Sequence, residues 1–101
     1  MFDPARYSND FEREHGSELS EWLRMLPGAV AARPLALVPD GATVTIAHGA
    51  LTLRWEVLPP RQIALVRLPR LRVHYRFEGV SDDERARFLR YFDLFMQRGG
   101  G

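Results

Sequence analysis

Polar and apolar residues alternate without exception along Arg70–Glu78, and this alternation is the clearest structural signal in the chain. Successive side chains of a β-strand point to opposite faces of its sheet, so the apolar residues of this stretch share one face. The pattern predicts a strand of an antiparallel sheet that is buried on one side and solvated on the other. The apolar face carries Leu71, Val73, Tyr75 and Phe77, and the polar face carries Arg70, Arg72, His74, Arg76 and Glu78.

A second alternating region, upstream of this strand, predicts a β-hairpin. Its strands are Ala42–His48 and Leu51–Val57, and the Gly49-Ala50 pair between them suits a two-residue turn. Such a turn places the apolar residues of both strands on one face, which supports this register. The apolar cross-strand pairs are Ile46 with Leu53, Val44 with Trp55 and Ala42 with Val57.

Proline marks an irregularity between the hairpin and the alternating strand. If Leu58–Arg61 forms a loop, continuing the hairpin pairing beyond it places the even-numbered residues from 64 to 68 on the core face. In the alternating strand Arg70–Glu78, by contrast, the odd-numbered residues face the core. The parity therefore changes near Pro69, which cannot donate a ladder hydrogen bond and is typical of a bulge, an edge or a turn. Two arrangements are open: one long strand with a bulge at Leu68–Arg70, or two strands that meet there in a tight turn.

In either arrangement, apolar residues lie on the outer, otherwise polar face of the sheet. Apolar side chains at such positions indicate contact with a second chain or with another element. We therefore expect a protein interface on this face, with a homodimer as one form of it. The expected interface residues are Leu58, Ile63, Leu65 and Arg67.

Two segments have the apolar spacing of amphipathic helices. Ser17 can cap a helix that runs to about Leu26 and ends at Pro27-Gly28. A second helix begins at Ser81–Glu84, a capping box that places acids at the positive end of the helix dipole. The apolar stripes are Leu19, Trp22, Leu23 and Leu26 in the first helix, and Phe88, Leu89, Phe92, Phe95 and Met96 in the second.

These elements predict an α+β fold in two layers. An antiparallel meander sheet of four or five strands, including a short strand at Leu35–Val38, forms one layer, and the C-terminal helix with the short N-terminal helix packs on its apolar face. Residues 17–101 form a single domain, and residues 1–16, which show no sustained period, are expected to be a flexible N-terminal arm. The expected core is Val44, Ile46, Leu53, Trp55, Val57, Val66, Leu71, Val73, Tyr75, Phe77, Phe88, Phe92 and Phe95.

The composition narrows the classes of function. The 101 residues include no cysteine, which excludes disulfides, thiolate catalysis and cysteine-based zinc sites and favours a cytoplasmic location. No apolar run reaches the ~20 residues that a membrane span needs, and the N-terminus lacks a signal-peptide pattern, so we expect no membrane partner. All fourteen basic residues are arginine, which is typical of a GC-rich bacterial coding sequence.

Positive charge is concentrated in the second half of the chain, where six arginines lie between Arg54 and Phe77 beside the single acid Glu56. Arginines at every second strand position lie ~6.6 Å apart, roughly the spacing of phosphates along an extended nucleic acid. The aromatic residues of this region face the core, however, so the polar face offers no aromatic side chains on which nucleic-acid bases could stack. The alternatives are a solvated sheet face, a site for anions or nucleic acid, and a protein interface. The residues of the anion or nucleic-acid site are Arg54, Arg70, Arg72, His74 and Arg76.

The chain carries no recognisable catalytic motif. His15, His48 and His74 lie in separate segments without the spacing of metal ligands, and the acids at 82–84 are explained by helix capping. We expect no catalytic residue, metal or cofactor, although an active site assembled in space from distant residues is still open. The leading hypothesis is a small non-catalytic binding or assembly module that acts through the outer sheet face. The alternative is a weak binder of nucleic acid or anionic ligands.

Overall fold

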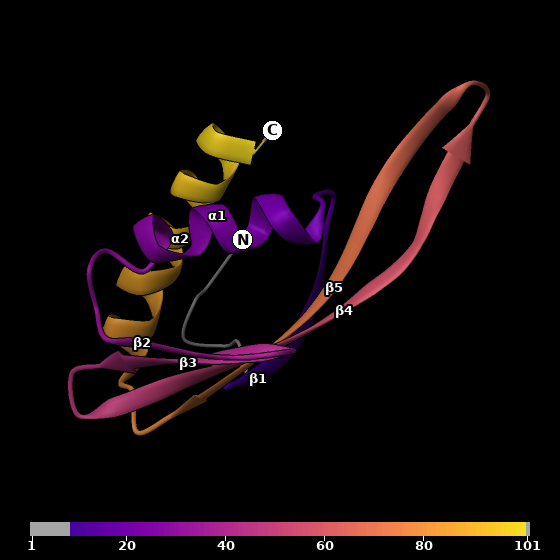
Figure 1. Cartoon of the computed structure of the whole chain (residues 1–101). Helices are drawn as coiled ribbons and strands as arrows, with labels where there is room; N and C mark the ends of the chain where they lie inside the picture. The colour runs from indigo at the N-terminus through magenta and orange to yellow at the C-terminus, as the bar shows by residue number, and fades with distance from the viewer. Residues whose placement is uncertain (1–8, 101) are drawn as a thin grey trace.

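An antiparallel five-stranded sheet with two helices on one face forms the architecture of the computed structural model, which describes residues 9–100 (Figure 1). The strand order is β1-β5-β4-β3-β2, so the last four strands form a meander and the first strand joins the sheet beside the last. The predicted two-layer α+β fold is confirmed. The strands are β1 (Asp10–His15), β2 (Leu35–Val38), β3 (Gly41–Ile46), β4 (Gly49–Ile63) and β5 (Val66–Glu78), and the helices are α1 (Leu19–Ala29) and α2 (Asp82–Gly100).

β1 lies within the segment for which the sequence predicts a flexible arm. Asp10–His15 pairs antiparallel with β5 along its whole length, so these residues form an edge strand, whereas residues 1–8 of the predicted arm lie outside the described residues. The inward positions of β1 hold Phe11, Arg13 and His15, of which only the first is apolar. The alternation that identifies a half-buried strand is therefore hidden in this segment.

The β3–β4 hairpin has the predicted core face but a different turn. Ala47 and His48 form its two-residue turn, so Ile46 pairs with Gly49 and the predicted cross-strand pairs are wrong. The register is shifted by an even number of residues, which leaves the side chains on their predicted faces. Gly49 lies outside the turn, and its lack of a side chain allows the backbone of β4 to pack closely against the end of β5. A Cβ atom at this position would overlap the carbonyl oxygen of Glu78.

β4 and β5 form one long hairpin, and the loop predicted at Leu58–Arg61 is replaced by strand. β4 runs through that segment to Ile63, and the turn to β5 consists of Ala64 and Leu65. Because this turn lies further along the chain than predicted, the pairing expected for the residues beyond the loop is wrong. Val66, which we expected in the core, is 54% exposed.

An irregularity in β4 lies opposite Pro69. The register between β4 and β5 shifts between Leu58 and Arg61, so that Pro59 and Pro60 form a bulge. The change of parity predicted near Pro69 is wrong for β5, where Leu68 and Arg70 lie on the same face, and the parity changes instead in β4 across Pro59 and Pro60. The bulge therefore lies in β4, and β5 is one unbroken strand.

The core lies between the sheet and the two helices. Two further residues predicted in the core differ: Val57 is 61% exposed, and Phe95 is only partly buried. α1 continues past Pro27 to Ala29, and the lack of a side chain at Gly28 admits the Phe95 ring of α2. The largest buried apolar side chains are Trp22, Leu26, Val30, Val44, Ile46, Leu51, Leu53, Leu71, Tyr75, Phe88 and Phe92.

α2 begins as the sequence predicts. The hydroxyl of Ser81 accepts a hydrogen bond of 3.2 Å from the backbone N–H of Glu84, and three acids occupy the first turn. Over residues 9–100, neither helix combines the length and the apolar character that crossing a membrane requires.

Candidate functional site

The polar face of β5 forms the outer surface of the sheet together with the polar rows of β1 and β4, as expected for a half-buried sheet. Each cationic side chain of the predicted anion site has an acidic neighbour on this surface. Ion pairs join Arg70 to Glu14 (2.9 Å), Arg72 to Glu56 (3.0 Å), Arg76 to Glu78 (3.8 Å) and Arg54 to Asp40 (3.8 Å), and His74 contacts Asp10.

β1 supplies the acids that sequence reasoning does not place on this face. Its outward residues are Asp10, Glu12 and Glu14, and they lie beside the arginines of β5. The hydrogen bond from Arg70 lowers the pKa of Glu14. The outer rows of β1, β4 and β5 together carry five carboxylates and five guanidinium groups. A surface of balanced charge attracts polyanions weakly, which disfavours nucleic-acid binding here.

The distal part of the β4–β5 hairpin, residues 57–70, projects away from both helices and is named the β-arm (Figure 1). β3 pairs with β4 only as far as Arg54, and β1 pairs with β5 only as far as Leu71. Beyond these residues, within the part of the chain that the structure describes, the two strands have only each other as sheet neighbours. The β-arm is thus a two-stranded ribbon, which is marginally stable in water on its own.

Apolar side chains of the β-arm are exposed to solvent. Leu65, at the tip, is 98% exposed, and the cross-strand neighbours Ile63 and Val66 are 53% and 54% exposed. Leu58 and Leu68 continue the same outer row toward the body of the sheet. The outer face of the β-arm is therefore an apolar extension of an otherwise charged surface.

The predicted interface residues divide between three places. Leu58 and Ile63 lie on the outer face of the β-arm, as predicted. Leu65 belongs to the turn at its tip, and Arg67, opposite Gln62, lies on the inner face. The structure therefore groups four predicted residues on one projection but not on one face.

The two edges of the β-arm are poor templates for strand addition. Pro59 and Pro60 interrupt the edge of β4, and Pro69 interrupts the edge of β5. Proline has no N–H group, so it removes donors that an added strand needs. Addition of a further strand at either edge of the β-arm is therefore disfavoured.

A groove of about 250 Å³ separates the base of the β-arm from the start of α1. Leu19 of α1 forms one apolar wall, and Val57, Pro60 and Pro69 of the β-arm form the other. Glu18 adds a carboxylate that has no ion-pair partner among residues 9–100. Arg67 and Arg70 also line the groove, so its guanidinium groups outnumber the single carboxylate, and what it offers a partner is a place for an apolar side chain.

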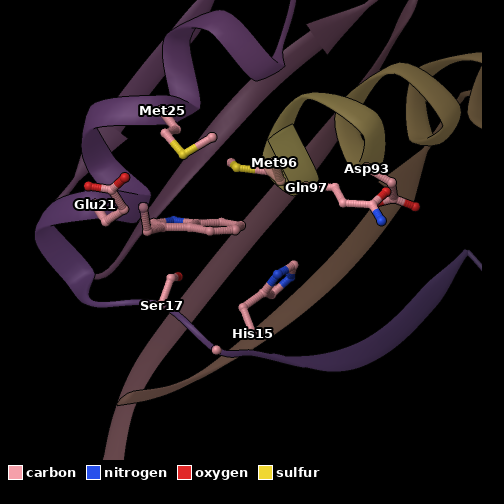
Figure 2. Close-up of a pocket in the computed structure, with 9 residues that line it drawn as sticks. His15, Ser17, Glu21, Met25, Asp93, Met96 and Gln97 are labelled. Atoms are coloured by element: carbon pink, nitrogen blue, oxygen red, sulfur yellow. The ribbon is translucent and has the colours of Figure 1, made fainter. Parts of the chain in front are cut away.

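A second hollow, a cavity of about 290 Å³, lies between α1, α2 and the end of β1 (Figure 2). Met25 reaches into it from α1 and Met96 from α2, while His15 borders it from the sheet side. Carboxylates of Glu21 and Asp93 lie in its rim. The lining thus combines soft apolar groups with hydrogen-bond acceptors, a composition typical of small-ligand sites.

Two polar contacts connect this cavity to the sheet. Nε2 of His15 lies 2.8 Å from the hydroxyl of Tyr75, and Arg13 donates a 2.6 Å hydrogen bond to Asp93. Burial, together with the charge of Arg13, lowers the pKa of His15, and burial raises the pKa of Tyr75. The imidazole and the phenol are therefore both neutral at pH 7 and can hydrogen-bond a ligand without repelling a cation.

Sequence reasoning identified His15 only as an isolated histidine and did not find the cavity. His15 and Asp93 come from opposite ends of the chain, and only the pairing of β1 with β5 brings them together. Among residues 9–100, no three histidine, aspartate or glutamate side chains converge to hold a metal ion.

Comparison of the chain with protein-family models, with curated proteins and with solved structures finds no match. Three surfaces of the structure are candidate functional sites: the charged outer face, the β-arm with its groove, and the cavity between the helices.

Proposed function

We propose that this chain is a non-catalytic assembly module that pairs with a second copy of itself through the β-arm. One observation carries the proposal: a two-stranded ribbon exposes apolar side chains at its tip and along its outer face, with no described element packed on it. Each Leu, Ile or Val that moves from water into an interface contributes ~1.5–3 kcal/mol. Burial of these side chains in an interface therefore stabilises the ribbon.

Charge supports a second copy as the partner. The β-arm carries Arg61, Arg67 and Arg70 and no acid, so its formal charge is +3. The other residues hold the remaining eleven arginines and all thirteen acids, which gives a formal charge of −2. Attraction between the β-arm of one copy and the body of another is therefore favourable, whereas two β-arms laid against each other repel.

The groove at the base of the β-arm supports a reciprocal arrangement. An arm from a second copy can place the apolar side chain of Leu65 against the walls formed by Leu19 and Val57. Two-fold symmetry repeats this contact, so every arm and every groove is used and the assembly closes as a dimer. The absence of cysteine suits a reducing compartment, and we propose the cytoplasm as its location.

The oligomeric state of the full chain tests this proposal. We expect light scattering between about 1 and 100 μM to give a mass that approaches twice the 11.6 kDa of one chain as the concentration rises. Leu65→Asp and Ile63→Asp should both give monomers, because a buried unpaired carboxylate opposes the contact. Leu94→Asp changes a leucine of α2 that is 50% exposed outside the β-arm, and it should leave the dimer intact.

A wild-type chain that is monomeric throughout this range contradicts the proposal, as does a dimer that persists in Leu65→Asp. The alternative, binding of nucleic acid or another polyanion, makes a different prediction about salt. Oligonucleotide binding that falls steeply as salt rises and is abolished by Arg72→Glu with Arg76→Glu would favour that alternative.

A further inference from the structure

We propose that the cavity between α1, α2 and the end of β1 binds a small organic cation with an apolar body, of the size and type of an aralkylammonium ion. This site is separate from the β-arm and its groove, and it adds ligand binding to the proposed assembly function. The inference rests on the shape, the soft apolar wall and the distribution of charge in the cavity.

The cavity has the size of a small ligand. Its volume of about 290 Å³ lies well above the ~150 Å³ that accommodates a benzene ring, and at the lower limit of sites for drug-sized molecules. The occupant that fits is therefore a single ring or short alkyl group with one polar head.

The apolar part of the lining suits a cation. Met25 and Met96 direct their thioether groups into the space between the helices (Figure 2). Trp22 also lines the cavity. Thioether sulfur is polarisable and packs well on aromatic rings, and the face of an indole attracts positive charge. A neutral aliphatic molecule gains the dispersion contact with the thioether sulfurs but not the attraction between a positive charge and the indole face.

The polar part of the lining favours a ligand that donates hydrogen bonds over one that accepts them. Its formal charges are the carboxylates of Glu21 and Asp93, and none of the lining residues is an arginine or lysine. Arg24 and Arg13 pair with these carboxylates from outside the lining, at 2.5 Å and 2.6 Å. A carboxylate offers about four lone-pair sites, so each retains acceptors for an ammonium group.

His15 gives the site a further neutral hydrogen-bonding group. Its Nε2 is engaged with the hydroxyl of Tyr75, which leaves Nδ1 for other contacts. The charge of Arg13 and burial both oppose protonation of this ring. An anionic ligand therefore meets two arginine-paired carboxylates and no cation among the lining residues, whereas an ammonium ion meets hydrogen-bond acceptors.

Titration of the full-length ¹⁵N-labelled chain with benzylammonium chloride tests the proposal by NMR. We expect saturable shifts that centre on the amides of Gly16 and Ser17 and on the indole N–H of Trp22. Benzyl alcohol has the same ring without the charge and should bind about tenfold more weakly, and benzoate should not bind. The Leu65→Asp variant should bind benzylammonium as the wild type does, which separates this test from that of the β-arm.

Substitutions of the carboxylates provide the second arm of the experiment. Glu21→Gln and Asp93→Asn should each weaken benzylammonium binding about fivefold or more. Glu84→Gln is the matched control, because Glu84 also pairs with an arginine three residues further on but lies outside the cavity lining. It should leave the affinity unchanged.

Three results overturn the proposal. They are the absence of saturable shifts, equal affinities for benzylammonium and benzyl alcohol, and an affinity that is unchanged in both Glu21→Gln and Asp93→Asn. Circular dichroism of each variant verifies the fold, and Glu21 is a surface residue whose replacement leaves the core intact.

Discussion

Three of the described glycines, Gly28, Gly41 and Gly49, lie where neighbouring groups pass too close for any side chain. Gly49 faces the backbone of Glu78 and Gly79, whereas Gly28 faces the aromatic ring of Phe95. Backbone atoms in a sheet cannot move aside without displacing the strand, but a ring at the end of a side chain can rotate. The same substitution is therefore expected to have different costs at the two positions.

We expect Gly49→Ala to lower the free energy of unfolding by about 2–4 kcal/mol, because the new methyl group forces β4 away from the end of β5. Gly28→Ala should cost less, since the Phe95 ring can turn and alanine stabilises a helix by about 1 kcal/mol relative to glycine. Urea unfolding followed by tryptophan fluorescence measures both. Equal effects at the two positions would contradict the close approach at Gly49.

His15 couples the stability of the fold to pH. Burial and the charge of Arg13 lower the pKa of this histidine below the ~6.5 of an exposed imidazole, so the unfolded chain binds the proton more readily than the folded chain. The stability that neutral His15 contributes is therefore fully present above pH ~6.5 and is lost as the pH falls through the folded-state pKa. The lowered pKa of Glu14 acts only below its ordinary value of 4.5.

We therefore expect the free energy of unfolding to decrease between pH 7 and pH 5, and His15→Gln to remove part of that decrease. Urea unfolding of the wild type and the variant at both pH values measures the effect. His48→Gln changes an exposed residue of the β3–β4 turn and serves as the control, with the same pH dependence as the wild type. An unchanged dependence in His15→Gln would refute the role of this residue.

At the scale of elements, the sequence predicts those features of a helix or strand that depend on residues close together in the chain. The capping serine and the acids of the first turn marked the start of α2, and the strict alternation of Arg70–Glu78 identified the core face of β5. The β3–β4 hairpin shows the limit of this reasoning. The sequence pattern predicts Gly49 as a turn residue, whereas the structure requires glycine there because the end of β5 passes beside it. A contact made by a distant strand leaves no mark on its sequence neighbours.

The run through Pro59 and Pro60 was missed for a related reason. Two consecutive prolines would normally end a strand that has neighbours on both sides. Here β3 stops pairing with β4 at Arg54, so this edge of β4 needs no backbone N–H donors at Pro59 and Pro60. β1 was missed because Arg13 and His15 occupy inward positions, where they contact Asp93 and Tyr75. Both features depend on which elements lie alongside, and the cavity depends on the same long-range pairing.

At the scale of the whole molecule, the β-arm and the body are separable. Every residue from Pro59 to Leu68 is exposed, and none belongs to the core. The ladder between β4 and β5 is regular up to the pair formed by Leu58 and Arg70, which lies at the base of the arm. The body therefore has its full core without the arm.

Replacing residues 59–69 with Asn-Gly should give a protein with the same sheet and core. Leu58 and Arg70 are cross-strand partners, and Asn-Gly suits the two-residue turn that then joins them. We expect a melting temperature within a few degrees of the wild type and a mass of one chain at all concentrations. Heat denaturation and light scattering measure both, and loss of the folded state would show that the arm supports the body.

The position of β1 beside β5 has a consequence for how the protein emerges during synthesis. The first described strand of the chain is translated tens of residues before the strand it pairs with, and no other strand flanks it. The meander from β2 to β5 can assemble as each strand appears, because every new strand finds its neighbour already made. β1 has to wait, and its docking over this long separation carries the largest loop-closure cost in the sheet. The segment that contributes three carboxylates to the outer face and His15 to the cavity therefore joins the sheet last, so both surfaces are completed only once β5 has been made.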